Sequence, residues 1–487
     1  MPGDHRQKLS VFSVITVLTL LLSAGCGVTL QSVEKDKEVG QATARQVEAD
    51  MGLYEEPGKA EYLNRVGERL VTAHSDQRFT YQFGVVDQYQ PNAFALPGGY
   101  IYVSRGLLVL TNSEDELANV LAHEIIHVSR RHSAKQSAKA AVPVLFALPG
   151  AIVGGVVHPD LGALLMAPAA VLGGAYLASH SRQDEFESDQ MGQQMASEAG
   201  YDPSALAAIL ARIEAFAEEY SGRKRIPGFF DTHPSTPDRV ARVLQDAGKI
   251  EWQRRDAAAG TQEDYLGRQD GLLVGEDPAM GVIRGHNFLH PELEFSMCFP
   301  EGWEVINTRQ AVFAGAPGKD GMVSLGIEGK DADPTEAAKK FEEKMSRKYR
   351  LRPSESTSMN IGDLPAYRLT YTGKDRGETV CTQFLWVAYR ERLYRFVGLV
   401  PERYYSLLRD TTSSFKPITP EERSSIRETR LRVVAAESGE TLTRLSERTG
   451  NEWTVELTAV VNGLDPKSPF AEGQQVKIAV SQPFRPQ

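Results

Sequence analysis

The chain has 487 residues, of which 41% are hydrophobic and 24% charged, which predicts two to four globular domains. This composition argues against a disordered chain and against a protein built mainly of membrane spans. The formal net charge of −10 argues against a nucleic-acid partner, because phosphates require a basic protein face. A globular protein that binds no nucleic acid is therefore expected.

Residues 1–25 have the pattern of an export signal. Two basic residues precede an apolar run from Val11 to Leu22, which is short for a bilayer span, and small residues then lead to Cys26. The order resembles a bacterial lipoprotein signal, in which Cys26 is acylated, although Ser23 stands where that signal usually has Leu. An uncleaved anchor or an ordinary secretory cleavage is the alternative. We expect a lipid-anchored protein on the periplasmic side of the cell envelope, with the outer membrane favoured over the inner.

The first part of the mature chain, residues 27–253, has mainly helical patterns. Ser113 and Glu116 have the spacing of a capping box at the start of one helix. Helices are expected at 33–50, 57–74, from 113 onwards, 182–199, 203–220 and 236–247, with strands at 80–86 and 99–103. Residues 254–280 contain few apolar residues and are predicted to be a linker.

Two further units follow the linker. Residues 281–420 alternate polar and apolar positions as strands do, with two helical stretches, which predicts an antiparallel α+β domain of unknown role. Residues 428–482 have a strand–helix–helix–strand pattern. Cys298 and Cys381 lie on expected strands of the middle domain and could form a disulfide, but the sequence cannot pair them. The whole chain is expected to belong to the α+β class.

The motif His123-Glu124-Ile125-Ile126-His127 lies within an expected helix. Residues four apart on a helix are separated by only about 40° around the axis, so both imidazoles can reach one ion. Zinc fits this pair, because imidazole binds it well and one coordination position can remain open for water. Glu124 lies beside that face, where it can act as the general base. The alternative is a pair of histidines on a helix surface.

A second helical motif supplies acidic residues. Glu185 and Asp189 are four residues apart and share one helix face. One carboxylate can bind the metal while the other orients a histidine ligand.

Together the two motifs resemble those of the HtpX and CAAX-prenyl-protease family of zinc peptidases (gluzincins), in its soluble periplasmic branch. The resemblance covers roughly residues 30–250 and implies one zinc ion per chain. It implies that His123, His127 and Glu185 are ligands, that Glu124 is the base and that Asp189 is the partner of His123. Ser188 departs from the family, which usually has Ala before the Asp.

The same resemblance assigns two more elements. The segment from Asn92 through Ala93 and Phe94 to Val103 resembles the family's edge strand, which takes up substrate by β-addition. Asp231-Thr232-His233-Pro234-Ser235 resembles an element whose histidine lies near the zinc. His233 could stabilise the oxyanion or cap the resting metal, and we favour the catalytic role. A histidine at a helix entry is the alternative.

Two apolar segments, Ala141–Val157 and Leu161–Ala178, separate the zinc motifs. They could form a membrane hairpin, but they are short and rich in Gly, Ala and Pro. Packing at the periphery of the peptidase domain is favoured over insertion.

The C-terminal unit resembles a divergent LysM module, a βααβ fold that binds N-acetylglucosamine polymers. The matching residues include Ser438-Gly439-Glu440-Thr441-Leu442 and Val461-Asn462-Gly463-Leu464. Peptidoglycan is the implied partner, and an adaptor without a glycan site is the alternative. Phe299-Pro300-Glu301-Gly302-Trp303 resembles the start of Mog1/PsbP-like domains.

These observations lead to one functional hypothesis and two rivals. We expect a zinc-dependent endopeptidase that degrades misfolded or unassembled envelope proteins, with Glu124 activating water against the scissile carbonyl. One rival is a peptidoglycan-associated scaffold or chaperone with little proteolysis. The other is an intramembrane protease.

Overall fold

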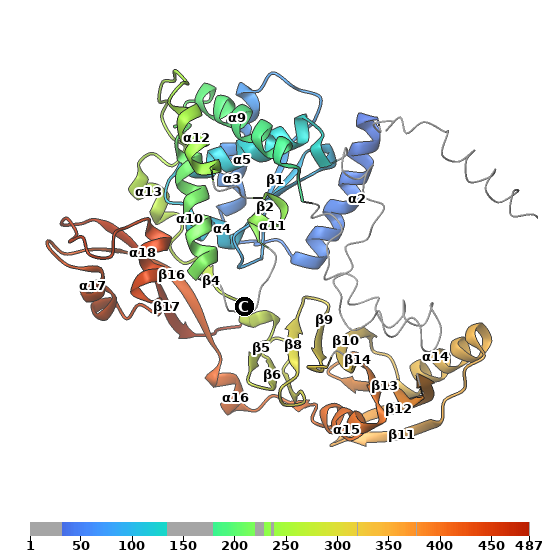
Figure 1. The fold of residues 1–487 in the computed structure, drawn as a ribbon. Coiled ribbons are helices and arrows are strands. Elements are labelled where there is room, and N and C mark those ends of the chain that lie inside the picture. Colours follow the sequence, from blue (N-terminus) through green and yellow to red (C-terminus); the bar gives the residue numbers. More distant parts are fainter. Residues whose placement is uncertain are drawn as a thin grey trace, which may run out of the picture.

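The computed structural model of the chain describes residues 32–133, 179–219, 228–234, 238–318, 320–375 and 377–486. Helices and strands are mixed, which confirms the α+β class. Figure 1 shows a helical unit from the first half of the chain, a sheet-rich unit coloured yellow to orange, and a small red C-terminal unit that lies beside the helical one. Cys26 and the apolar segments at 141–178 lie outside the described residues.

The helical unit surrounds a three-stranded sheet in the order β1-β3-β2. The strands are β1 (Gln82–Val86), β2 (Ala93–Leu96) and β3 (Tyr100–Ser104). β3 runs parallel to β1 and antiparallel to β2, so β2 is an edge strand. The helices are α2 (Val33–Met51), α3 (Lys59–Ala73), α4 (Arg105–Leu110), α5 (Glu114–Ser129), α9 (Arg182–Glu198), α10 (Ala205–Glu219), α11 (Phe229–Thr232) and α12 (Arg239–Ala247).

The turn between β2 and β3 depends on Gly99. Its φ of 109° is one that side chains rarely adopt, and a Cβ there would lie 2.3 Å from the carbonyl oxygen of Thr80. Gly99 therefore allows the tight turn that places the edge strand β2 antiparallel to β3.

Helix α5 begins and ends with specific local contacts. Ser113 accepts a hydrogen bond from the backbone of Glu116, but the Glu116 carboxylate accepts from the backbone of Asn112, so only half of the expected capping box forms. At the other end Arg131 has a φ of 59°. This left-handed conformation, two residues beyond the last helical residue Ser129, ends the helix and turns the chain back.

Residues 254–280, which were predicted to be a linker, are packed against the helical unit. They contain helix α13 (Gln262–Gly267) and strand β4 (Leu273–Val274). Tyr265 and Leu272 are buried in the same hydrophobic core as α5, and the Tyr265 hydroxyl lies 2.6 Å from that of Thr111. The low apolar content of this segment did not predict its packing, because a few well-placed apolar residues suffice to anchor it.

The middle unit is built from two antiparallel sheets. Helix α14 packs on β12 and β13, and α15 contacts β14. The sheet orders are β11-β12-β13-β14-β10-β9-β8 and β15-β7-β6-β5. The strands are β5 (Val282–Arg284), β6 (Asn287–His290), β7 (Phe295–Cys298), β8 (Glu304–Asn307), β9 (Ala311–Gly315), β10 (Met322–Lys330), β11 (Glu355–Ile361), β12 (Leu364–Asp375), β13 (Glu378–Tyr389), β14 (Arg392–Pro401) and β15 (Lys416–Pro417), and the helices are α14 (Pro334–Tyr349), α15 (Tyr405–Ser413) and α16 (Pro420–Ser425).

The two cysteines of this unit are free. Cys298 ends β7 in the smaller sheet, whereas Cys381 lies on β13 in the larger one. The disulfide that the sequence left open is therefore not formed.

The C-terminal unit has the expected order of two helices between two antiparallel strands: β16 (Arg427–Ala435), α17 (Leu442–Thr449), α18 (Val455–Asn462) and β17 (Gln475–Pro483). It is docked on the helical unit, because β4 pairs with β16, and Leu457 and Val461 join the core of that unit. The ammonium of Lys477, a fully buried residue, donates to the backbone oxygens of Val109 (2.5 Å) and Thr111 (3.1 Å). These carbonyls lie at the C-terminal end of α4, where a cation is favoured.

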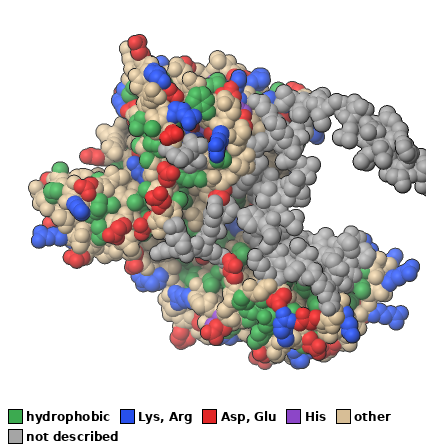
Figure 2. Space-filling model, viewed as in Figure 1, with side chains coloured by type: hydrophobic (Ala, Val, Ile, Leu, Met, Phe, Trp, Pro, Cys, Tyr) green, Lys and Arg blue, Asp and Glu red, His purple; other side chains and the backbone are tan. Residues whose placement is uncertain are grey.

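On the face drawn in Figure 2, acidic and basic side chains are interspersed over the surface of the units. Within the described residues, every helix is too short or too polar to cross a membrane.

Candidate active site

The site is formed where α5 and α9 pack against each other. Gly192 allows this contact: a Cβ at that position would lie 3.0 Å from the backbone nitrogen of His123 and 3.2 Å from its Cα. Both helices are therefore close enough for side chains from one to reach those of the other.

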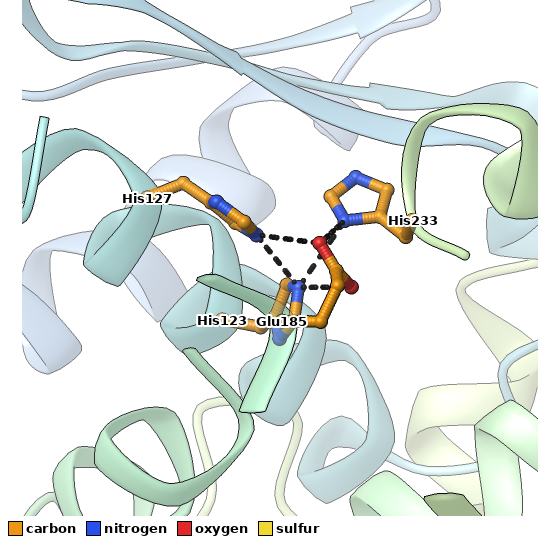
Figure 3. A group of neighbouring side chains, drawn as sticks. All are labelled: His123, His127, Glu185 and His233. Atoms are coloured by element: carbon orange, nitrogen blue, oxygen red, sulfur yellow. Dashed lines mark hydrogen bonds and ion pairs between the residues drawn. The ribbon is translucent and has the colours of Figure 1, made fainter. Parts of the chain in front are cut away.

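Four side chains from three segments converge there (Figure 3). His123 and His127 lie on one face of α5, as their spacing predicts, and Glu185 comes from the first turn and a half of α9. His233 follows α11 directly. One ligand atom from each of the four lies within 4.8 Å of the others, and all four residues are buried.

The separations fit a tetrahedral metal site. The Nε2 atoms of His123 and His127 are 3.0 Å apart, and Oε1 of Glu185 lies 3.3 Å from that of His127. His233 Nδ1 lies 3.3 Å from His123 Nε2 and 3.1 Å from the same Glu185 oxygen. Ligands bound to zinc at about 2.0–2.1 Å in tetrahedral geometry would be roughly 3.3–3.5 Å apart. The nitrogen and oxygen donors therefore suit zinc, and His233 takes the place of a fourth donor.

Glu124 lies next to these donors. It is fully buried, and neither carboxylate oxygen accepts a hydrogen bond from the part of the chain that the structure describes. His233 Nε2 lies 3.4 Å from Oε1 of Glu124. A buried carboxylate without hydrogen bonds is costly unless a ligand or water completes it. Burial also raises the pKa of Glu124, which makes it a better proton acceptor.

Asp189 and Arg239 hold one of the histidines. Asp189 Oδ1 lies 3.0 Å from Nδ1 of His123, and Arg239 donates two hydrogen bonds of 2.8 Å to the Asp189 carboxylate. Arg239 also lies 2.9 Å from Oε2 of Glu185. The expected pairing of Asp189 with His123 is thus present in the geometry. The sequence analysis did not identify Arg239, although it follows His233 closely in the chain.

Two further histidines border the site, and the sequence analysis missed both. His180 stacks on the His127 ring with centroids 3.9 Å apart. Burial lowers the pKa of His180 to about 3, with a further contribution from His233. His132 places its Nδ1 3.0 Å from Nδ1 of His127. The signal for His132 was its position shortly after the motif, but an uninterrupted helix would have carried it to another face.

The protonation of the donors is strongly coupled. Burial disfavours the charged form of His123, but hydrogen bonds to Asp189 and Glu185 outweigh it and raise its pKa to about 9. Burial opposes ionisation of Glu185 too, yet the charge of His233 and the hydrogen bonds from His123 and His127 hold its pKa well below the usual value. A metal ion must displace protons from such donors, so metal affinity should fall with acidity.

The predicted substrate-binding residues lie on β2 and immediately before it. Asn92, Ala93 and Phe94 are buried, and β2 pairs only with β3 in the described residues. Neither polar atom of the Asn92 side chain has a hydrogen-bond partner within them. The neighbouring Pro91 oxygen accepts from the backbone of Phe229, whose ring stacks on His233 with centroids 4.4 Å apart. The start of β2 is therefore linked to the histidine at the metal site.

The helix pair, its His-Glu-x-x-His motif and the acidic ligand on the second helix define a zinc metallopeptidase domain of the gluzincin type. Comparison with known families agrees: residues 57–247 match the model of peptidase family M48.

Similar proteins include two kinds of metallopeptidase. The chain is 30% identical over 250 residues to the beta-barrel assembly-enhancing protease of Escherichia coli, covering 50% of this chain and 49% of that protein. The identity, the aligned length and both coverages are the same for the protein of that name from Yersinia pestis. It is 32% identical over 217 residues to the mitochondrial metalloendopeptidase OMA1 of Schizosaccharomyces pombe, covering 44% of this chain and 61% of that protein. The chain thus spans about half to three-fifths of the length of these relatives.

Among solved structures, a cyanobacterial PsbP from Synechocystis matches 29% of this chain and 98% of its own length, with 15% identity and a TM-score of 0.24. The PsbP-like character of residues 281–420 therefore stays a prediction.

Proposed function

We propose that the chain is a zinc-dependent endopeptidase of the bacterial cell envelope that hydrolyses misfolded or unassembled envelope proteins. The observation that carries the peptidase assignment is the buried carboxylate of Glu124, which accepts no hydrogen bond within the described residues and lies beside the four converging donors. Metal sites that serve only structure are enclosed by their ligands and need no such base.

In this proposal His123, His127 and Glu185 hold the metal. Zinc would supply Lewis-acid chemistry, since it polarises a carbonyl and makes water acidic enough to attack near neutral pH. Asp189 fixes the ring of His123 through Nδ1, and Arg239 holds Asp189 and Glu185 in place. The ligands are therefore oriented before substrate arrives.

Glu124 takes the proton from the attacking water and returns it to the leaving amine. Burial raises the pKa of Glu124, which strengthens the carboxylate as the acceptor of the water proton. Glu124 is fully buried, so bulk water has little access to its carboxylate.

A polypeptide substrate would extend along the edge strand β2. Main-chain hydrogen bonds to an edge strand bind an extended peptide with little dependence on its sequence, which suits the degradation of unfolded chains. The side-chain amide of Asn92, which has no hydrogen-bond partner within the described residues, can donate to and accept from a substrate backbone. Ala93 and Phe94 continue the same edge.

The test compares wild-type protein with Glu124→Gln in casein cleavage and in metal content. We expect both proteins to carry about one zinc per chain and only the wild type to cleave casein. Glu198→Gln is the matched control, because it makes the same change at an exposed position of α9. Cleavage by Glu124→Gln at the wild-type rate would refute the proposal.

We further propose that the peptidase is lipid-anchored through Cys26, at the outer membrane in preference to the inner, and that the LysM-like unit binds peptidoglycan. Supporting the second point is the βααβ order of residues 428–482. Sedimentation of the intact protein with purified peptidoglycan sacculi tests it, and a protein that remains in the supernatant would leave the unit an adaptor.

The scaffold hypothesis is disfavoured by the presence of both Glu124 and Glu185, which a non-proteolytic protein would not need.

A further inference from the structure

A third histidine, His132, contacts the ring nitrogen of His127 that faces away from the other metal donors. His127 Nε2 faces the other donors, 3.0 Å from His123 Nε2, while its Nδ1 lies 3.0 Å from Nδ1 of His132. The other ring nitrogen of His132, Nε2, lies 3.1 Å from Oε2 of Glu187. His132 is fully buried, and the Ser188 hydroxyl lies 3.4 Å from its Nδ1.

These contacts fix the tautomer of each ring once a metal is bound. A histidine that binds zinc through Nε2 carries its proton on Nδ1, so His127 must donate to His132. His132 then accepts at Nδ1 and carries its own proton on Nε2. That proton points at the Glu187 carboxylate, which completes the chain of hydrogen bonds.

The end of α5 creates this arrangement. On a continuous helix His132 would lie five residues from His127 and about 140° away around the axis, out of reach. The left-handed conformation of Arg131 ends the helix and brings His132 back against His127. Non-glycine residues rarely adopt that conformation. In this conformation Arg131 makes an ion pair of 2.6 Å with the buried Asp36 of α2.

Helix α9 supplies a carboxylate that positions each of the two metal-binding histidines, directly for His123 and through His132 for His127. Asp189 contacts Nδ1 of His123, and Glu187 contacts His132, which contacts Nδ1 of His127. Arg130 makes an ion pair with Glu187 and keeps that carboxylate in position.

We propose that His132 and Glu187 are positioning residues that hold His127 in its metal-binding tautomer and orientation. This inference rests on the proposed zinc site but assigns a role to residues outside the ligand set.

The test measures zinc affinity by competition with a chromogenic chelator. His132→Leu keeps the bulk and removes both hydrogen bonds, and we expect zinc affinity to fall by about 10–100-fold. His132→Asn retains an acceptor for His127 and should recover part of that loss. Wild-type affinity in His132→Leu would overturn the inference. So would equal losses in His132→Leu and His132→Asn, since these would indicate a packing role only.

Glu187→Gln provides a second arm that does not threaten the fold, because the side chain of Glu187 is 25% exposed. We expect a smaller loss of zinc affinity in this variant and no further loss when it is combined with His132→Leu. Glu198→Gln on the same helix is the control and should bind zinc as the wild type does. A Glu187→Gln protein indistinguishable from this control would remove Glu187 from the proposal.

The outcome separates the two hypotheses. The proposed function fails if wild-type protein holds no zinc, or if the Glu124→Gln variant cleaves casein at the wild-type rate. If wild-type protein binds zinc and cleaves casein, but the His132 variants bind zinc equally well, only the positioning role fails.

Discussion

Gly192 of α9 lies against the backbone of His123, with room for a hydrogen but hardly for a methyl group. A Cβ would lie 3.0 Å from the His123 nitrogen and 3.2 Å from its Cα, closer than most real Cβ contacts. The distance between the helices at the metal site is therefore set by a residue that makes no chemical contribution.

Gly192→Ala should push α9 away from α5. Alanine favours a helix over glycine by up to about 1 kcal/mol, but overpacking against rigid backbone costs about 1–3 kcal/mol. We expect a net loss of stability and weaker zinc binding, because Glu185 and Asp189 move with α9. Thermal unfolding and chelator competition measure the two effects. Gly267→Ala is the control, since nothing lies within 4 Å of a Cβ there. Equal behaviour of the two variants would contradict this view of the helix contact.

Lys477→Ala should loosen the C-terminal unit from the peptidase domain. The substitution leaves a cavity and removes the donor to the Val109 and Thr111 carbonyls, which together should cost about 2–4 kcal/mol. Limited proteolysis and thermal unfolding measure the change, with the exposed Lys467→Ala as control. If both variants unfold as the wild type does, the buried lysine does not stabilise the docking.

Cys26→Ala should abolish lipid attachment. Growth with a labelled fatty acid should label the wild type and the Cys298→Ala control, but not Cys26→Ala. Without acyl chains to insert into the bilayer, the variant should also leave the membrane fraction. A labelled Cys26→Ala protein would contradict the proposed anchor site.

The sequence predicted the parts of the site that depend on local periodicity. His123 and His127 at i and i+4, and Glu185 and Asp189 at the same spacing, share helix faces whatever the rest of the chain does. The spacing could not show that a left-handed Arg131 would return His132 to His127. In that conformation Arg131 makes an ion pair with Asp36, which is 95 residues away in the chain.

In the fold, too, local patterns were predictable from the sequence and long-range contacts were not. Amphipathic helices and alternating strands were predicted within a few residues of their bounds. The docking of the C-terminal unit was not, because it depends on Lys477 meeting the end of α4, a contact between residues 366 and 368 positions apart. Residues 254–280 were taken for a linker for a similar reason, since Tyr265 and Leu272 become core residues only when α5 and α10 supply the other half of the core.

His233 is the residue for which sequence and structure suggest different roles. The sequence favoured an oxyanion donor, whose removal lowers kcat by about a hundredfold or more. In the structure its Nδ1 lies as close to His123 Nε2 and Glu185 Oε1 as those donors lie to each other, in the position that a catalytic metal must leave open. We therefore propose that this geometry is a capped resting state.

His233→Ala separates the two roles by the sign of the effect. A cap competes with water and substrate, so its removal should raise basal kcat, and zinc content should stay near one per chain because three donors remain. An oxyanion donor lost in the same way would lower kcat with the same zinc content. Steady-state cleavage of a fluorogenic peptide, with the exposed His286→Ala as control, measures the change. A kcat within twofold of wild type would remove His233 from both roles and leave it as a structural residue that stacks on Phe229.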